Sequence, residues 1–386
     1  MFDLTKNAVD VLPEGRLEEQ LKAGRPLRVK LGIDPTTADI HLGHTVVLEK
    51  LAEFQRAGHT VVLIIGDFTA RVGDPSGRSS TRPLPSAEEI EANATTYQEQ
   101  AFKILDRERT EVRRNSEWLQ MEPGALLGLL AQTTVARLLE RDDFQKRMAA
   151  AQPIAALELL YPLLQGYDSV AVEADLELGG TDQKFNLLFG RDIQAAYGQA
   201  PQTIMTLPIL VGTDGVQKMS KSLGNYVGVT DAPEEMFGRL MSIPDEAMDE
   251  YYRLLLGADR PQGPPNEAKR ELGRRIVDRF HGAGAGAGAE EHFNRVFVER
   301  AAPEEMPDVS LGDYRADGNG TVHLPRLIAG AFGLSSSEGR RLLQQGGVKL
   351  DGETVPAEPL DLEICRLDGR VLQVGKRRFC RLRATP

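Results

Sequence analysis

The 386-residue sequence is poor in cysteine and in long apolar runs. Its two cysteines, Cys365 and Cys380, are too few for a disulfide scaffold or a four-ligand zinc site, and they favour a reducing compartment. The purely apolar stretches are short, such as 61–65, whereas a membrane-spanning helix needs roughly 20 such residues. The first ten residues lack the basic start and apolar core of a secretory signal. We therefore expect a cytoplasmic protein with no membrane segment.

Positively charged residues are fewer than negatively charged ones, and the formal net charge is −11. The deficit is uneven along the chain. Residues 323–386 carry 11 Lys and Arg against 7 Asp and Glu, a net of +4, so the preceding 322 residues carry a net of −15. A basic end on an acidic body can bind nucleic acid locally, because the field at the contact patch decides binding. Chance scatter explains the imbalance equally well, so charge alone leaves both interpretations open.

The first part of the chain predicts a parallel α/β sheet. Continuous apolar, β-branched runs at 27–34 and 60–68 are typical of buried strands, and the segment between them has apolar residues at helical spacing. Strand, helix and strand within about 40 residues form a βαβ unit, which pairs its strands in parallel. We expect a later strand of the same sheet at 202–212, and further helices at 87–106, 123–139 and 180–197.

The pattern changes after about residue 225. Amphipathic helical segments with proline stops predict a helical domain at 226–306 that follows a first domain at 1–225. The low-complexity segment 282–291 is either a flexible linker or an alanine-rich continuation of a helix, and its sequence favours linker only slightly. We expect a linker at 307–322 and a small α+β domain at 323–386, built from two helices, a hairpin and a strand.

Two histidines, His41 and His44, flank Gly43 where the first predicted strand gives way to a helix. A helix start presents unpaired N–H groups and the positive end of the helix dipole, which together bind anions. Gly43 lets a ligand approach the backbone, and two imidazoles can donate hydrogen bonds to phosphate oxygens. Taken alone, the motif is equally typical of surface or capping histidines.

The segment KMSKS at 218–222 places Lys218 and Lys221 three residues apart among hydroxyl residues. Lysine is a flexible point charge with three donors and suits a polyphosphate. An isolated pair of this kind is more often an exposed basic turn. The combination of H-x-G-H with K-M-S-K-S about 175 residues later is far more specific than either motif.

On these two motifs the sequence resembles the class I aminoacyl-tRNA synthetases. Three further features are similar to those of the bacterial tyrosyl-tRNA synthetases: the helical face with Tyr161, Gln165 and Asp168, the pair Asp182 and Gln183, and the stretch GDPSGRSSTR at 73–82. The resemblance extends over nearly the whole chain. The last 60 or so residues resemble an S4-type RNA-binding domain. The resemblance implies a Rossmann-like, doubly wound catalytic domain followed by a helical domain and an S4-like domain.

The resemblance also implies a role for each matching residue. Asp74, Tyr161 and Gln165 would hold the α-ammonium of tyrosine, Asp168 would accept a hydrogen bond from its phenol, and Gln183 would orient its carboxylate. Lys30 occupies a position where many members have a tyrosine that contacts the phenol, so it either donates to the phenol or points away. The expected ATP-binding residues are Thr36, His41, Gly43, His44, Gly180, Asp182, Leu210, Val211, Lys218 and Lys221. Those that would surround the pyrophosphate are Thr36, His41, Arg78, Arg82, Lys218 and Lys221, whereas His44 would lie near the ribose and adenine.

The same resemblance implies substrates and partners. L-Tyrosine would be activated with ATP, with Mg²⁺ carried by the nucleotide, and then transferred to the terminal ribose of tRNA(Tyr). The family is homodimeric, and the apolar stretch 125–139 is the candidate interface. A departure from the family pattern is Val47, where some members have a polar ATP contact. The residues expected to contact RNA are Arg340, Arg341, Lys376, Arg377, Arg378 and Arg381.

Three other interpretations remain open at this point. A tryptophanyl enzyme shares the fold and both signatures, although the bacterial forms lack the S4-like end. Another adenylyl or nucleotidyl transferase shares H-x-G-H without the second motif. A catalytically idle RNA-binding protein could keep the fold, against which the intact motifs argue.

Overall fold

The computed structural model of the chain describes residues 3–36, 39–76, 86–298, 306–315, 320–375 and 378–384. The chain forms two compact units, Met1–Gly286 and Ala287–Pro386. Four of the expected site residues, Arg78, Arg82, Lys376 and Arg377, lie outside the described residues.

The first unit is built on a sheet of six described strands, in the order β1-β6-β5-β2-β3-β4. All neighbouring strands are parallel except that β1 pairs antiparallel with β6 at one edge. The order reverses between β2 and β5, as in a doubly wound sheet, so the expected fold class is confirmed. The strands are β1 Asp10–Leu12, β2 Arg28–Ile33, β3 Thr60–Ile65, β4 Thr110–Arg114, β5 Leu176–Gly180 and β6 Thr203–Leu207.

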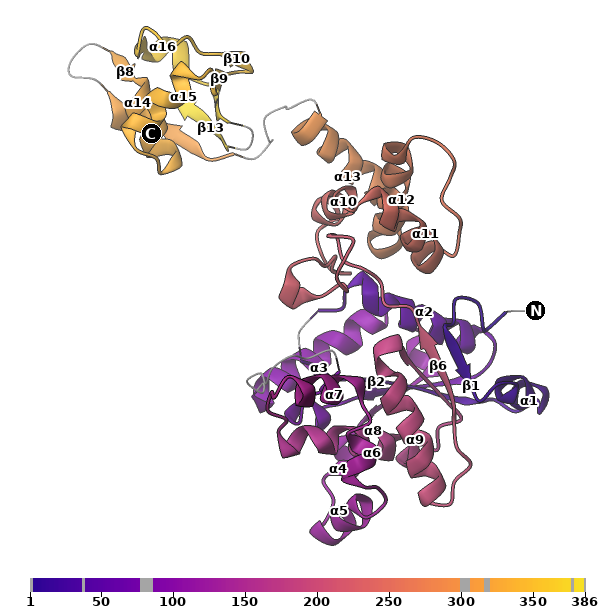
Figure 1. Ribbon diagram of the computed structural model, residues 1–386. Helices are drawn as coiled ribbons and strands as arrows, with labels where there is room; N and C mark the ends of the chain where they lie inside the picture. The colour runs from indigo at the N-terminus through magenta and orange to yellow at the C-terminus, as the bar shows by residue number, and fades with distance from the viewer. Residues whose placement is uncertain are drawn as a thin grey trace. The chain divides into compact units, whose positions relative to one another are not determined.

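Helices cover both faces of this sheet, as Figure 1 shows, with α2 and α3 on one side and α8 and α9 on the other. Because both faces are covered, β3 has the continuous apolar run of a fully buried strand, and its last five residues are buried. The helices are α1 Arg16–Lys22, α2 Leu42–Arg56, α3 Ala87–Ala101, α4 Ser116–Leu119, α5 Pro123–Leu130, α6 Val135–Leu138, α7 Asp142–Ala149, α8 Tyr161–Ala171 and α9 Lys184–Ala196.

Some predicted boundaries in this unit are wrong. The helix expected at 123–139 is two helices, because Thr134 caps a new one by accepting a hydrogen bond from the N–H of Arg137. The helix expected at 180–197 begins at Lys184, after strand β5, and the strand expected at 202–212 ends before Pro208, which has no N–H to donate. Strand β4 was not predicted, because its sequence TEVRR is half-buried at the sheet edge and reads as polar.

The segment after residue 225 is helical, with α10 Pro233–Met241, α11 Met248–Leu256, α12 Pro265–His281 and α13 Ala285–Phe293. Up to Gly286 it belongs to the same compact unit as the sheet, so it is not a separate body. Side-chain contacts join them: for example, Arg279 of α12 forms an ion pair with Glu49 of α2, and the Tyr251 hydroxyl donates to the Val211 carbonyl at 2.8 Å.

The low-complexity segment 282–291 is mostly helix, which decides between its two interpretations. Gly282 ends α12 with a positive φ of 97°, and α13 starts three residues later. A Cβ on Gly286 would lie 2.3 Å from the Arg274 carbonyl oxygen, so glycine allows α13 to approach α12 closely. Within the Gly-Ala repeat, Gly286 therefore serves helix packing.

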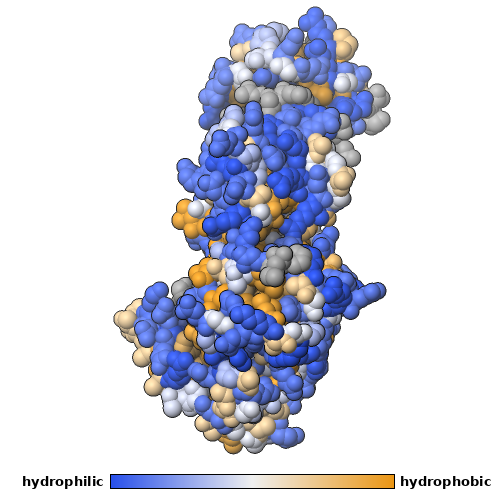
Figure 2. Space-filling model, turned by 90° about the vertical axis from the view of Figure 1, so that its right-hand side faces the viewer, coloured by the Kyte–Doolittle hydropathy of each residue, from blue (hydrophilic) through white to orange (hydrophobic). Residues whose placement is uncertain are grey.

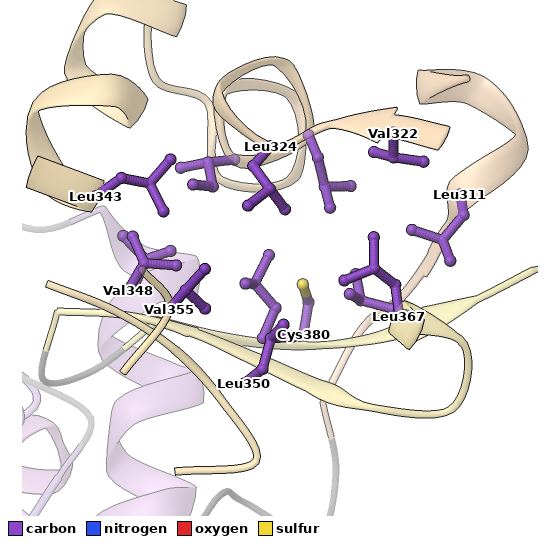
Figure 3. Close-up of a cluster of buried hydrophobic side chains, with 14 residues drawn as sticks. Leu311, Val322, Leu324, Leu343, Val348, Leu350, Val355, Leu367 and Cys380 are labelled. Carbon is purple, nitrogen blue, oxygen red and sulfur yellow. The ribbon is translucent and has the colours of Figure 1, made fainter. Parts of the chain in front are cut away.

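The second unit is a small α+β domain, and Figure 3 shows its apolar core between the helices and the sheet. Leu311 and Val322 belong to that core, and residues 308–310 form strand β7, which pairs with β13. The linker predicted at 307–322 is therefore wrong over its described part. The elements are β7 Asp308–Ser310, β8 Thr321–His323, α14 Leu324–Phe332, α15 Ser336–Gln344, β9 Val348–Leu350, β10 Glu353–Thr354, β11 Asp361–Glu363, α16 Ile364–Leu367, β12 Val371–Val374 and β13 Arg378–Arg383.

The face of the molecule in Figure 2 is mainly hydrophilic, with hydrophobic residues in small groups. Over the described part of the chain, no helix is both long and apolar enough to cross a bilayer. Both cysteines are free thiols, with Cys365 exposed and Cys380 inside the core of the second unit.

Candidate functional site

A cavity of about 400 Å³ lies where the strand order reverses, at the carboxyl ends of β2 and β5. Open α/β sheets bind their ligands at this position, and the volume suits a small-molecule site. The cavity brings together fourteen of the residues expected from the sequence: Thr36, His41, Gly43, His44, Asp74, Tyr161, Gln165, Asp168, Gly180, Asp182, Gln183, Leu210, Lys218 and Lys221.

His41 and His44 form a stacked pair at the start of α2. His41 is the N-cap residue, and its backbone N–H donates to Nδ1 of His44 at 3.2 Å, with the ring centroids 3.8 Å apart. Burial lowers the pKa of His41 to about 2 and that of His44 to about 4, and the charge of Lys218 adds to both shifts. Both rings are therefore neutral at physiological pH. Since Nδ1 of His44 accepts, its proton is on Nε2, and the ring can donate from there to a ligand oxygen.

Gly43 is required by the packing of this pair. A Cβ at position 43 would lie 3.0 Å from both Cε1 and Nδ1 of His41 and 3.5 Å from Cβ of Met219. Any larger residue would push the His41 ring or the KMSKS segment outward. The sequence motif H-x-G-H thus has a steric reason as well as a ligand-binding one.

The KMSKS segment forms a turn that is held by side chains and faces the cavity. Val211 forms an antiparallel bridge with Lys218, and Asn225 donates to Asp214 at 2.8 Å while accepting from the N–H of Ser220 at 2.8 Å. Lys218 lies 3.4 Å from Asp182, and Lys221 pairs with Asp39, which raises the pKa of Lys221. Both lysine side chains are partly exposed, so they can reach a ligand that enters from solvent.

Asp168 lines the cavity and is almost fully buried. It accepts a hydrogen bond from Nε1 of Trp118 at 2.8 Å and one from Nδ2 of Asn115 at 3.3 Å. Burial raises its pKa to about 6, and these hydrogen bonds together with the charge of Lys30 oppose the shift. Its carboxylate is held in place with lone pairs left for a donor on a ligand.

Asp34 is a cavity residue that sequence reasoning missed. It accepts hydrogen bonds from Thr69 Oγ1 at 2.7 Å and from the Tyr161 hydroxyl at 2.9 Å. Burial raises its pKa to about 7, and the nearby Asp74 carboxylate adds to the shift. Gly66 makes room for it, because a Cβ there would lie 2.0 Å from Oδ1 of Asp34. The signal available was an acidic residue directly after a predicted parallel strand.

A chain of hydrogen bonds fixes Asp74 and Gln183 relative to each other. Nε2 of Gln183 donates to Asp74 at 2.8 Å, and Asn186 donates to Oε1 of Gln183 at 3.0 Å. Arg141 completes the chain, since it donates to Asn186 and, at 3.1 Å, to Ser76. Sequence reasoning missed Arg141, Asn186 and Ser76, because they lie far apart along the chain and no pattern relates them, although Ser76 belongs to the stretch GDPSGRSSTR.

Two expected residues do not line the cavity. Lys30 is fully buried beneath it and pairs with Glu177 at 2.9 Å. Leu210 lines the cavity but Val211 does not, and the carbonyls of both are engaged within the protein, by the N–H of Met219 and by the Tyr251 hydroxyl. Of the two orientations left open for Lys30, the structure shows the one in which its side chain points away from the cavity.

Comparison with known proteins decides the family. A family model described as tRNA synthetases class I (W and Y) matches residues 22–298. The chain belongs to this family. Among its relatives are the tyrosine–tRNA ligase of Geobacter sulfurreducens, 52% identical over 98% of this chain and 97% of that protein, and that of Thermotoga maritima, 52% identical over 98% and 96%. These matches place the synthetase among the bacterial tyrosine–tRNA ligases.

Solved structures share the fold of the catalytic part of this synthetase. The tyrosyl-tRNA synthetase of Aeropyrum pernix superposes with a TM-score of 0.60 at 20% identity, covering 75% of this chain and 96% of that one. The Archaeoglobus fulgidus enzyme, solved with L-tyrosine, gives 0.57 at 24% identity, covering 75% and 94%. The class I synthetase fold is thereby confirmed.

The expected RNA-binding residues of the synthetase do not all share one surface. Arg341 lies on α15 and Arg378 is exposed at the start of β13. Arg381 alternates with Cys380 and Leu382, which point into the core, and it therefore lies on the opposite face of the sheet. Arg340 is exposed on α15. The described arginines are therefore distributed over α15 and both faces of β13.

Proposed function

We propose that this synthetase activates L-tyrosine with ATP, forming tyrosyl-adenylate and pyrophosphate, and then transfers tyrosine to the 3′-terminal ribose of tRNA(Tyr). The observation that carries the proposal is one cavity that joins a phosphate-binding end, with the His pair and the KMSKS lysines, to a buried acidic end. The homology to tyrosine–tRNA ligases over nearly the full chain supports it.

The acidic end suits the amino acid. Tyr161, Asp74 and Gln165 would take the α-ammonium, with Asp34 adding negative charge beside Tyr161. Asp168 would accept from the phenol hydroxyl. Gln183, held by Asn186 and Asp74, would orient the carboxylate toward the nucleotide. Each polar group of a bound tyrosine would thus have a hydrogen-bond donor or acceptor of the protein beside it.

The opposite end suits ATP. Asp182 would bind the ribose, Leu210 would contact the adenine, and Gly180 would allow close approach. His41, His44, Lys218, Lys221 and Thr36 would surround the phosphates. Over the described residues no group of three or more His, Cys, Asp or Glu side chains could hold a metal ion, so Mg²⁺ would arrive with ATP as part of the substrate.

The chemistry needs no nucleophile from the protein. The tyrosine carboxylate attacks the α-phosphorus in line and pyrophosphate leaves, while negative charge builds on the phosphate oxygens. Neutral imidazole donors and mobile lysines stabilise that charge as it develops, and the hydrogen-bonded carboxylates fix the position of the attacking group. The adenylate then transfers its acyl group to a ribose hydroxyl of tRNA.

Amino-acid-dependent pyrophosphate exchange, screened with all twenty amino acids, tests this function. Tyrosine should support exchange and tryptophan should not. A response to tryptophan would assign the chain to the sister enzymes of the family, and no response to any amino acid would indicate an idle synthetase fold.

Tyrosine binding should weaken at acid pH. The pKa of Asp34 is about 7 and that of Asp168 about 6, and both groups act on tyrosine as carboxylates. As the pH falls below 7, protonation removes first the charge that attracts the ammonium and then the acceptor for the phenol. We expect the KM for tyrosine to rise by well over tenfold from pH 8 to pH 5.5, because loss of a required charge with a pKa of about 7 costs about tenfold per pH unit once the group is mostly protonated.

The KM for ATP should change less over that range, because both histidines titrate below it. Exchange kinetics at each pH, with stability checked by thermal unfolding, give both constants. A tyrosine KM that stays constant from pH 8 to pH 5.5 contradicts the acidic-end assignment.

We further propose that the second unit binds RNA through its arginines and that the protein acts in the cytoplasm as a homodimer. Free cysteines agree with a reducing compartment. For the dimer, α5 and α6 carry exposed apolar residues, with Leu127 67% and Val135 61% exposed, as an interface before assembly would. Sedimentation at micromolar concentration tests the dimer.

Removal of the second unit should separate the two half-reactions. Since β7 and Leu311 belong to its core, the chain should be cut after residue 306 rather than within 307–322. All cavity residues lie between 31 and 222, so tyrosine-dependent exchange should stay within about twofold of the full chain. Aminoacylation of tRNA should fall sharply and lose much of its salt dependence, because phosphate contacts release counterions.

Both assays should be run on one purified preparation of the truncated protein. Loss of exchange in a folded truncated protein contradicts the separation of functions. Undiminished tRNA charging places RNA binding in the first unit instead.

A further inference from the structure

A buried ion pair lies beneath the amino-acid end of the cavity. Lys30 of β2 and Glu177 of β5 are register partners on neighbouring strands, at the point where the strand order reverses. Their Nζ and Oε1 atoms are 2.9 Å apart, and the side chains are 0% and 1% exposed. A buried pair of this kind costs desolvation energy and gives little net stability, so a role beyond stability is worth seeking.

Lys30 has no donor left for a ligand. Besides Glu177, its Nζ donates to Oγ of Ser169 at 2.8 Å and to the carbonyl of Gln165 at 3.1 Å. An ammonium has three donors, and all three are engaged. Lys30 therefore acts on the cavity through the groups that it holds.

Glu177 connects the pair to the cavity, which it lines. Its Oε1 accepts from Nε2 of Gln165 at 3.2 Å, and its Oε2 accepts from Nε2 of Gln202 at 2.5 Å and from Ser169 at 3.2 Å. An ionised carboxylate only accepts hydrogen bonds. The Gln165 amide must therefore turn its NH₂ group toward Glu177, which leaves its oxygen on the other side.

That oxygen is the unsatisfied group in the network. Oε1 of Gln165 is buried and has no hydrogen-bond partner, which is costly unless a ligand supplies a donor. An ammonium in the cavity supplies one. If the amide were reversed, its NH₂ group would face the ammonium and repel it.

We propose that Lys30 and Glu177 are positioning residues, which fix the orientation of the Gln165 amide so that its oxygen accepts a hydrogen bond from the α-ammonium of the amino acid. This inference rests on the proposed function, in which Gln165 binds that ammonium. The ion pair with Lys30 holds the Glu177 carboxylate in place, and the bond of Lys30 to the Gln165 carbonyl holds the backbone of α8 at the same place. The charge of Lys30 also favours the ionised form of Asp168, since it lowers the pKa of that group.

A purely structural pair would behave differently. Its loss would lower the stability of the sheet and weaken all ligands alike. Loss of a positioning pair should selectively weaken ligands that carry an ammonium. The test is therefore a ratio of two affinities, for L-tyrosine and for 3-(4-hydroxyphenyl)propanoate, which lacks only the amino group.

The double variant Lys30→Met/Glu177→Gln removes the pair without leaving a buried charge. A glutamine at 177 can present either its oxygen or its NH₂ group, so it no longer dictates the orientation of Gln165. We expect tyrosine to lose about tenfold in affinity, as for a hydrogen bond to a charged group, while the des-amino ligand loses less than twofold. Because Trp118 is the single tryptophan and contacts Asp168, its fluorescence can report both titrations.

The matched control is Arg147→Met/Glu158→Gln, which removes another buried ion pair of the first unit whose residues do not line the cavity. Its thermal stability should fall comparably, but the ratio of the two affinities should stay at the wild-type value. An equal change of the ratio in both double variants overturns the proposal, because the effect would then follow from the loss of any buried ion pair.

Gln165→Ala separates failure of this inference from failure of the proposed function. It should lower the ratio about as much as the Lys30→Met/Glu177→Gln change, and combining all three substitutions should lower it no further. If Gln165→Ala alone leaves the ratio unchanged, the assignment of Gln165 to the ammonium is wrong. If Gln165→Ala lowers the ratio and the pair variant does not, only the positioning role is wrong.

Discussion

Replacement of Asp168 by alanine is expected to abolish most of the preference for tyrosine over phenylalanine. Asp168 lines the cavity, is 3% exposed and is held by Trp118 and Asn115. When phenylalanine binds, the carboxylate loses water without gaining a hydroxyl, and an unpaired buried charge is strongly unfavourable. For tyrosyl-tRNA synthetases the ratio is about 10⁵, a value that we adopt from those enzymes rather than calculate.

Without the carboxylate, only shape and apolar contact distinguish the two amino acids, and a difference of one small group is typically worth about 10- to 200-fold. We therefore expect kcat/KM for tyrosine to fall by several orders of magnitude and that for phenylalanine to change much less. Exchange kinetics with each amino acid measure both. They should be run at pH 8, where Asp168, with a pKa of about 6, is ionised in the wild type.

Trp118→Phe is the graded companion variant, since it removes one donor to Asp168 and keeps an aromatic ring. It should reduce the ratio far less than Asp168→Ala does. An Asp168→Ala enzyme that is active and still prefers tyrosine by the wild-type factor would falsify the placement of the phenol beside Asp168.

The second large effect is expected from His44→Ala and Lys221→Ala, each of which should lower kcat for exchange by about 10²–10³. Both groups line the cavity, at the end proposed to bind the phosphates. Charge builds on the phosphate oxygens only as the α-phosphorus becomes five-coordinate, so these donors act more strongly on the transition state than on bound ATP. The KM for tyrosine should change little, because neither group lies at the acidic end.

The histidine effect should not depend on pH above 6, since His44, with a pKa of about 4, is neutral throughout that range. The lysine effect depends on charge, so Lys221→Arg should retain more activity than Lys221→Ala. The control is Lys269→Ala, which breaks a lysine–aspartate pair of 2.8 Å in the helical segment, away from the cavity. Exchange rates within twofold of wild type for both site variants contradict an ATP site between these motifs.

Much of the synthetase could be predicted from its sequence where the signal is local. The apolar run of β3 and the helical spacing of apolar residues in α2 predicted the βαβ unit. A parallel strand is buried on both faces and is therefore apolar throughout, whereas a helix is buried on one face and is apolar only there. The two motifs and the helical face of Tyr161, Gln165 and Asp168 indicated residues that the cavity does bring together. The predicted ends of helices and strands were wrong where a single capping residue or proline determines them, as at Thr134 and Pro208.

The rest was decided by contacts between distant segments. Strand β4 and the segment 307–322 have sequences typical of polar or linker segments, because part of each faces solvent. Which of their residues are buried depends on the segments that pack against them in the fold. Arg141 is 45 residues from the Asn186 that it holds, and no local pattern relates them.

Lys30 shows the difference most clearly. The sequence placed a lysine in the strand next to the amino-acid pocket and left its direction open, because a side chain of that length reaches either the phenol or a neighbouring strand. Only the pairing of β2 with β5 puts Glu177 opposite it. A buried ammonium is stable only when it is paired, so the partner strand, and not the strand that carries the lysine, determines where it points.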